Sequence, residues 1–205
     1  MLLSNKFIKK LTYLSLLSVI ISCSDRQEKI PVVDFQNNAQ VLEIVKKHYN
    51  KEAQVAFGGM YDETGKQFIA AGLEINNTDE WGVKFVFLEK TGDELKVIYE
   101  TDILDGSFKE SFVNKIKFAS LDYDLLYYNS QGYFLGSGGG EVFSYIIDLE
   151  NKQVYYAHLV VESETATSLF ISDNTINKEL ANFFTVTLKK DYPNLKIVDE
   201  DIFVE

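Results

Sequence analysis

Cysteine is almost absent from this chain, because its 205 residues include only Cys23. A single cysteine forms no internal disulfide, so the stability of the fold must come from packing. Histidine is also scarce. His48 and His158 are the only two, and neither has a second ligand at the spacing of a metal motif. The sequence therefore predicts no metal site and no cofactor.

Basic residues and long apolar runs are in short supply as well. The chain has 20 Lys and Arg against 31 Asp and Glu, for a formal charge of −11, and no basic cluster interrupts this balance. Such a chain repels phosphate backbones, so nucleic acid is not an expected partner. The N-terminal apolar run, 11–21, is about half the length that spans a bilayer. A membrane-spanning helix is not expected there.

The N-terminus has the order of parts of a secretion signal. The first ten residues carry three lysines and no acid, the apolar run follows, and it leads through a small residue into Ile20-Ile21-Ser22-Cys23. This arrangement resembles the bacterial lipoprotein signal, whose lipobox is matched by those four residues. The resemblance implies that residues 1–22 are removed and that Cys23 is diacylated and then acylated on its new amino group.

The same resemblance predicts where the protein resides. Two or three acyl chains give stable anchoring, so the mature protein is expected on a membrane through its lipid. Ser24 after the cysteine is typical of outer-membrane lipoproteins. Asp25 and Glu28 resemble the acidic export signal of surface lipoproteins in the Bacteroidota, although Arg26 interrupts them, so the periplasmic and surface faces both stay open. Removing 1–22 removes three lysines and no acid, which takes the formal charge from −11 to −14.

The mature chain reads as a short tether followed by one domain. Residues 23–38 are mostly polar and contain Pro31, as is typical of a linker. The remainder, 39–205, is long enough for one hydrophobic core. With 46% hydrophobic and 14% aromatic residues, the chain is too apolar for disorder.

Two segments have the periodicity of amphipathic helices. In 39–50, Val41, Ile44, Val45 and His48 follow the spacing of one helix face, and Asn37 or Asn38 is the expected N-cap. Near the C-terminus a second helix is expected after a cap at Asp173 or Thr175 and before Pro193. Its apolar face consists of Ile176, Leu180, Phe183, Phe184 and Leu188.

Most of the remaining chain alternates between β-forming runs and short turns. Three hairpins are predicted, each with Gly or Asn at the turn: 54–61 with 67–76, 82–89 with 95–101, and 142–149 with 153–161. Further strands are expected at 122–128, 132–135 and 195–198, while 108–118 fits a helix or a strand. The predicted fold class is α+β, with a single curved antiparallel sheet of about 7–9 strands and an N-terminal and a C-terminal amphipathic helix.

A glycine-rich segment and the tyrosines near it are the candidate binding surface. The run Gly136-Ser137-Gly138-Gly139-Gly140 lacks the Lys and Ser/Thr of a phosphate loop, and Leu135 occupies the first glycine position of a nucleophile elbow. Beside Phe134, Glu141 and Phe143 it could rim a site. Tyrosines crowd the second half, where they serve either as contact residues or as strand packing. The candidates are Tyr133, Gly136, Gly138, Gly139, Tyr145 and Tyr156.

Three functional hypotheses follow from these observations. The first is a non-enzymatic, lipid-anchored envelope lipoprotein that binds another envelope component, a protein or a glycan. The alternative is an inhibitor or immunity-type lipoprotein, whose charge would complement a basic toxin or hydrolase. The third is a hydrolase, which would need a concave cluster of perturbed carboxylates. No catalytic residue is assigned, because acids are too abundant in this chain to single out a pair.

Overall fold

The computed structural model of the protein describes most of the chain after residue 28. The described residues are 29–108, 112–130, 133–134, 139–163, 166–175, 177–195 and 197–204. The helices are α2 (Asn38–His48) and α3 (Lys178–Asp191). The strands are β1 (Ala53–Gly59), β2 (Phe68–Asn76), β3 (Trp81–Thr91), β4 (Glu94–Glu100), β5 (Phe112–Ile116), β6 (Leu125–Asn129), β7 (Tyr133–Phe134), β8 (Gly140–Asp148), β9 (Gln153–Ser163), β10 (Ala166–Ser172) and β11 (Ile197–Val204).

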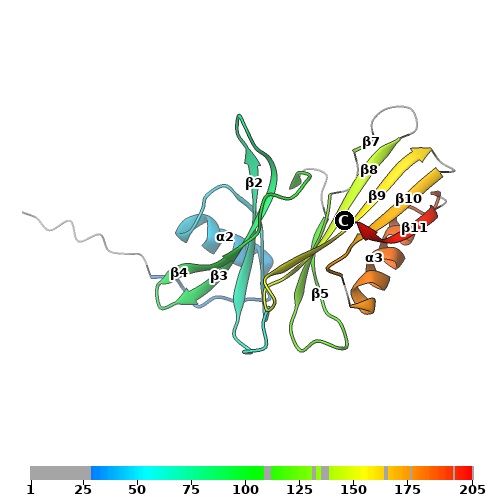
Figure 1. Ribbon diagram of the computed structural model, residues 1–205. Helices are drawn as coiled ribbons and strands as arrows, with labels where there is room; N and C mark the ends of the chain where they lie inside the picture. The colour runs from blue at the N-terminus through cyan, green and yellow to red at the C-terminus, as the bar shows by residue number, and fades with distance from the viewer. Residues whose placement is uncertain are drawn as a thin grey trace, which may run out of the picture.

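These strands form two sheets (Figure 1). The first sheet has four strands in the order β1-β2-β3-β4, all antiparallel. The second has seven strands in the order β11-β10-β9-β8-β6-β5, with β7 paired to β8. Its pairs are antiparallel except for β10 with β11, which run parallel. The predicted α+β class with antiparallel hairpins and two helices is confirmed, but the prediction of one sheet of about 7–9 strands is wrong.

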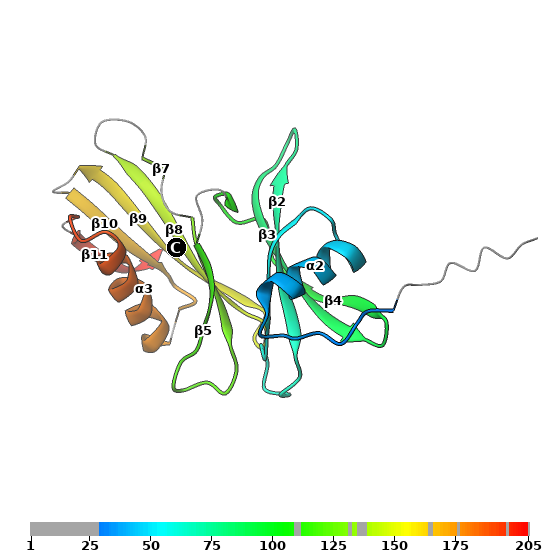
Figure 2. The same ribbon diagram turned by 180° about the vertical axis from the view of Figure 1, so that it is seen from behind.

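The sheets and helices stack as four layers, α2, first sheet, second sheet and α3 (Figure 2). The central strands of both sheets bury residues on both faces, because each sheet has a helix on its outer face and the other sheet on its inner face. Between the sheets, Phe85 and Phe87 of β3 pack in one apolar cluster with Leu126 and Tyr128 of β6. We call this contact between the two sheets the central layer. Two sheets therefore form where one was predicted, since the apolar inner faces bury each other.

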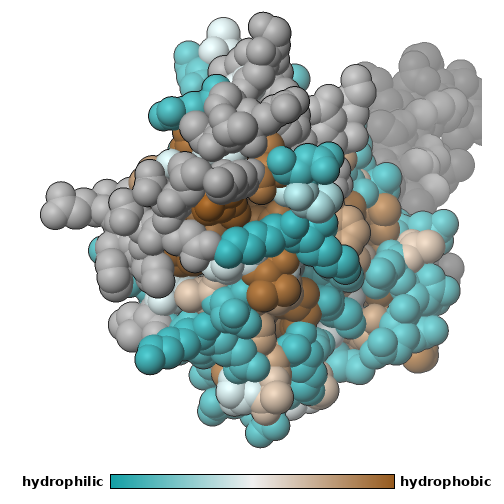
Figure 3. All heavy atoms as spheres, turned by 90° about the vertical axis from the view of Figure 1, so that its right-hand side faces the viewer, coloured by the Kyte–Doolittle hydropathy of each residue, from teal (hydrophilic) through white to brown (hydrophobic). Residues whose placement is uncertain are grey.

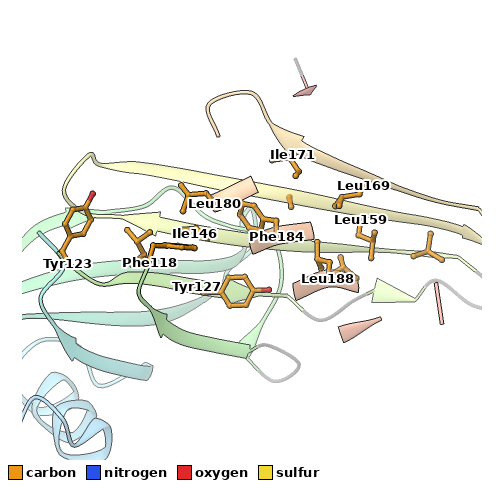
Figure 4. Packing of buried hydrophobic residues seen from close by; sticks show 14 residues of the cluster. Phe118, Tyr123, Tyr127, Ile146, Leu159, Leu169, Ile171, Leu180, Phe184 and Leu188 are labelled. Atoms are coloured by element: carbon orange, nitrogen blue, oxygen red, sulfur yellow. The ribbon is translucent and has the colours of Figure 1, made fainter. Parts of the chain in front are cut away.

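Each helix packs its apolar face against the sheet next to it. Val41 and Val45 of α2 pack on Ile69 and Val86 of the first sheet. Leu180, Phe184 and Leu188 of α3 point into the cluster that contains Leu159 and Leu169 (Figure 4). The α3 side of the molecule is largely hydrophilic at its surface, with apolar residues visible between hydrophilic ones (Figure 3). This is the arrangement that the helical periodicity predicts.

Both helices begin at an asparagine cap. Asn37 Oδ1 accepts the backbone N–H of Gln40 at 3.2 Å, as predicted. For α3 the predicted caps, Asp173 and Thr175, are wrong. Asn177 is the N-cap and accepts the N–H of Glu179 at 2.8 Å. Thr175 is not available as a cap, because its buried hydroxyl lies 2.8 Å from Ser172 Oγ.

The predicted hairpins are confirmed and one strand was missed. The pairs β1–β2, β3–β4 and β8–β9 match the three predicted hairpins. The segment 108–118, which fitted a helix or a strand, contributes β5. Strand β10 was not predicted, because its sequence ATSLFIS mixes hydroxyl and apolar residues. Its Thr167 and Ser172 are nevertheless buried.

Part of the predicted tether packs against the domain. Ile30 is buried, and Val33 and Phe35 pack on the cluster under α2. A Cβ at Gly58 would lie 2.5 Å from the carbonyl oxygen of Phe35, so β1 and this segment approach closely. The folded unit therefore includes residues from about 30 onward, within the 23–38 segment that the sequence assigns to the tether.

Candidate functional site

A cleft of about 610 Å³ opens between the two sheets. The sheets pack together over β3 and β6 and diverge toward the end where β8, β9 and β10 extend beyond the first sheet (Figures 1 and 2). One wall is the inner face of the second sheet, and the other is the segment 103–105 that follows β4. We call this site the aromatic cleft.

The sheet wall of the aromatic cleft is built by strand alternation. Every second residue of a strand points to the same face. Phe143 and Tyr145 of β8 therefore share the inner face with their cross-strand partners His158 and Tyr156 of β9. On the next strand, Phe170 of β10 is the partner of His158. Register alone thus brings five rings to one surface.

Four nearly parallel rings form a row across three strands, and we call this row the stack. Tyr128 and Tyr145 are stacked with centroids 5.7 Å apart and planes within 11°. Tyr145 stacks on Phe143 at 6.3 Å, and Phe143 stacks on His158 at 4.2 Å. Only Phe143 and His158 are close enough for direct face contact, while the other pairs of the row are offset. The row therefore gives the cleft an apolar, aromatic wall.

The opposite wall is fixed to both sheets by hydrogen bonds. Leu104 pairs with Val83 of β3 through two backbone hydrogen bonds of 2.8 Å. The Tyr128 hydroxyl donates to the carbonyl oxygen of Asp105 at 3.0 Å. The Tyr145 hydroxyl donates to Asp105 Oδ2 at 3.0 Å and accepts the Asp105 N–H at 3.2 Å. Asp105 is consequently held at the cleft by two rings of the stack.

Gly106 permits this close approach. Its φ of +110° lies in the region that favours glycine, and a Cβ at this position would overlap Tyr128 Oη and lie 2.7 Å from Ser130 Cβ. A side chain at position 106 would push the segment 103–105 away from the stack. The position of Asp105 therefore depends on a glycine that follows it.

Tyr145 remains a neutral hydrogen-bond donor. Burial raises its pKa well above the ordinary value of 10, and the adjacent Asp105 carboxylate raises it further. A neutral phenol keeps the proton that it donates to a neighbouring carboxylate, whereas a phenolate has none to donate. The neutral Tyr145 hydroxyl is therefore the donor to the Asp105 carboxylate at the cleft.

His158 is the one histidine of the cleft, and it lies between two phenylalanines. Its ring stacks on Phe143 and lies 6.2 Å from that of Phe170. Nε2 lies 3.4 Å from Glu141 Oε2, which is close enough for an ion pair once the imidazole is protonated. The geometry is nevertheless not that of a hydrogen bond, and Nε2 makes none with any residue that the structure describes.

The structure brings together two of the predicted site residues. Tyr145 and Tyr156 both line the aromatic cleft, with centroids 6.4 Å apart. Gly139 precedes β8, where a Cβ would lie 3.0 Å from the carbonyl oxygen of Val161. Tyr133 lies in β7 and pairs with Glu141. Gly136, Gly138 and the lipid attachment residue Cys23 lie outside the described residues.

Sequence reasoning missed the residues that the turns and neighbouring strands bring to the cleft. Phe170 belongs to the strand that was not predicted, and Asp105 belongs to the segment between β4 and β5. For His158, the alternation with Tyr156 was a usable signal, because it places both residues on one face. Nothing local in the sequence indicates that Asp105 reaches the Tyr145 hydroxyl across 40 residues.

The described part of the chain offers no further chemical centre. Within it, no group of three or more His, Cys, Asp or Glu is arranged to hold a metal ion. Asp62 lies in the β1–β2 turn and accepts the N–H of Thr64 at 3.0 Å, which is an ordinary turn contact. None of the helices described is long and apolar enough to cross a membrane.

Comparisons with known proteins leave the cleft as the principal guide to function. No protein-family model, no curated protein and no solved structure matches the chain.

Proposed function

We propose that the protein is a lipid-anchored binding protein of the bacterial cell envelope and that the aromatic cleft is its ligand site. The observation that carries this proposal is the open, ring-lined cleft between two otherwise packed sheets. Its volume of about 610 Å³ falls in the usual range of ligand sites, which are mostly apolar with a few placed polar groups. Asp105 and the Tyr145 hydroxyl are such groups here.

The anchoring part of the proposal rests on the lipobox at the N-terminus. Lipid on Cys23 would hold the domain at the outer membrane, on its periplasmic or surface face. A Cys23→Ala variant is expected to leave the membrane fraction or to accumulate as uncleaved precursor. If it instead fractionates as a mature membrane protein, lipid at Cys23 is not the anchor.

The groups at the cleft favour binding over catalysis. The raised pKa of Tyr145 keeps its hydroxyl protonated at neutral pH, so it is not available as a general base, and the hydroxyl already donates to Asp105. Tyr145 and Asp105 thus serve each other as hydrogen-bond partners. Large apolar rings with one fixed charge are typical of recognition sites.

Glycan binding is the weaker form of the proposal. A sugar needs several hydrogen-bonding groups, and most of the residues that line the cleft are apolar. Such a lining suits the apolar side chains of a protein better. The proposed ligand is therefore an envelope protein.

A crosslinked pull-down tests this function. The tagged, lipidated protein would be crosslinked in whole envelopes and its partners read by mass spectrometry, in parallel with Phe143→Ala. The matched control is Phe112→Ala. Phe112 is 48% exposed and precedes Val113, which packs into the central layer, so alternation places Phe112 on the opposite face of the second sheet. Loss of a stoichiometric partner in Phe143→Ala alone supports the proposal, and a partner retained in both variants contradicts it.

The formal charge favours one second candidate, an inhibitor or immunity-type lipoprotein. After loss of residues 1–22 the charge of −14 would steer a basic toxin or hydrolase toward the domain. Association of such a pair slows steeply as salt rises. Repeating the pull-down at low and high salt separates the candidates by degree, since complete loss of the partner at high salt is expected only of the inhibitor, whereas apolar contacts in the cleft retain part of the binding.

A further inference from the structure

Among the residues that the structure describes, those that line the aromatic cleft or contact its lining include two carboxylates. Asp105 lines the cleft, and none of the residues that line it is Lys or Arg. Glu141 lies beside His158. Two carboxylates, those of Asp105 and Glu141, therefore lie beside an apolar floor of rings.

The Asp105 carboxylate is oriented toward a ligand in advance. Its Oδ2 accepts from Tyr145, while Oδ1 makes no hydrogen bond with any described residue. Gly106 and the Tyr128 hydroxyl fix the backbone on which this carboxylate stands. Binding of a cation next to Asp105 would therefore cost little conformational entropy, because this carboxylate is already held in place.

The shape of the cleft favours a segment of a larger partner over an isolated small molecule. Sites for small molecules enclose most of the ligand surface, whereas this cleft is largely open to solvent. A protein segment that inserts one side chain would cover the open side with its own surface. The two walls of the cleft would contact the inserted side chain, and the rest of the segment would lie outside the cleft.

We propose that the aromatic cleft recognises a protein segment in which a large apolar side chain is flanked by Lys or Arg. This inference rests on the proposed binding function and specifies its ligand. The apolar side chain lies against Phe143, Tyr156 and Phe170. The neighbouring basic groups face Asp105 and Glu141.

Four matched peptides test both halves of this inference. They are acetyl-Gly-Lys-Trp-Lys-Gly-amide, its two forms with Gln or Glu in place of both lysines, and its form with Ala in place of Trp. Binding is measured by calorimetry on the full lipidated protein in zwitterionic nanodiscs, with empty nanodiscs as the blank. The lysine peptide is expected to bind best, with about threefold loss per charge in the Gln form and a larger loss in the Glu form. The Ala form should not bind.

Two substitutions locate the charge effect. Asp105→Asn removes the negative charge, so it should narrow the difference in affinity between the Lys and Gln peptides. It keeps an acceptor for the Tyr145 hydroxyl, so binding should not be abolished. Asp93→Asn is the matched control, because Asp93 is exposed in the β3–β4 turn, at the opposite end of that hairpin from Val83 and Leu104. It should change nothing.

The outcomes separate this inference from the proposed function. Equal binding of the Lys and Gln peptides, or tightest binding of the Glu form, overturns the basic flank but leaves an apolar binding cleft. Binding of 2-naphthylmethylamine without binding of any peptide assigns the cleft to small molecules and overturns the protein segment. If no probe binds, the inference fails. The proposed function then fails as well only if Phe143→Ala still retains the envelope partner.

Discussion

The central layer of this protein has a closed end and an open end that are made of the same kind of residue. At the closed end Phe85 and Phe87 pack against Tyr128 and Leu126, and all four side chains are fully buried. At the open end Phe143, Tyr156, His158 and Phe170 line the aromatic cleft. Phe143 and Tyr156 pack against the same cluster but are only partly buried.

The difference between these ends lies in what covers the rings. The second sheet has seven strands and the first only four, so the wider sheet extends past its neighbour. Rings that meet the opposite sheet serve stability, whereas rings beyond its edge keep apolar area available for a partner. Stability and binding therefore divide along one continuous aromatic face.

The largest effect is expected at the closed end. Phe85 is fully buried and contacts the rings of Tyr128 and Phe108 at centroid distances of 5.4 and 5.8 Å. Phe85→Ala should lower the free energy of unfolding by about 3–5 kcal/mol, because it leaves a cavity between two sheets. Urea unfolding measures this loss. A cost below that of Phe143→Ala would show that the two ends are not distinguished by packing.

The next effect is expected where the two ends meet. Gly106→Ala should cost about 2–3 kcal/mol, since it combines an unfavourable φ with overlap on the Tyr128 hydroxyl. Gly65→Ala is the matched control. Gly65 also has positive φ, at +71°, but a Cβ there would meet open space, so about 1 kcal/mol is expected. Equal costs for both variants would mean that the contact between Gly106 and Tyr128 contributes nothing.

The open end should lose function more than stability. Phe143 is only partly buried, so Phe143→Ala is expected to cost about 1–2 kcal/mol in the free energy of unfolding. The same change should abolish binding of the lysine peptide, because it removes the middle of the ring stack. Urea unfolding and calorimetry on one preparation compare the two effects. Normal peptide binding by a folded Phe143→Ala protein would contradict the division between the ends.

The smallest effect concerns the hydrogen bonds that join the cleft walls. Tyr145→Phe removes both bonds of its hydroxyl to Asp105 and should cost about 1 kcal/mol at neutral pH, because water replaces them at exposed Asp105.

The raised pKa of Tyr145 adds a pH dependence to this comparison. The unfolded tyrosine ionises near pH 10, while the folded one stays neutral to higher pH. Its stabilising contribution is thus complete below pH 10 and is lost as pH rises above it. The decline in unfolding free energy above pH 10 should be shallower in Tyr145→Phe. If the free energy of unfolding falls equally steeply above pH 10 in both proteins, the Tyr145–Asp105 pair does not cause the loss of stability at alkaline pH.

Local sequence signals were enough for the hairpins and for the existence of both helices. Glycine or asparagine at the turns marks the pairs β1–β2, β3–β4 and β8–β9, and the helical spacing of Val41, Ile44 and Val45 marks α2. Tyr145 and Tyr156 were identified as surface candidates, and the structure places both in the cleft.

What sequence did not indicate depends on contacts between distant segments. The division into two sheets follows from which apolar faces meet, and alternation within a strand does not specify the partner face. The hydroxyl residues of β10 made it resemble a loop, although Thr167 is fully buried. Asp105 joins the site through hydrogen bonds to residues on β6 and β8, which only the folded chain brings together.

Site-specific photocrosslinking in living cells tests the central claim most directly. A benzoylphenylalanine would replace Tyr156 inside the aromatic cleft or, in a second strain, Phe112 on the opposite face of the second sheet. The account predicts one envelope protein crosslinked from position 156 and absent from position 112. The same adduct from both positions, or an adduct from position 112 alone, would contradict the cleft as the binding site.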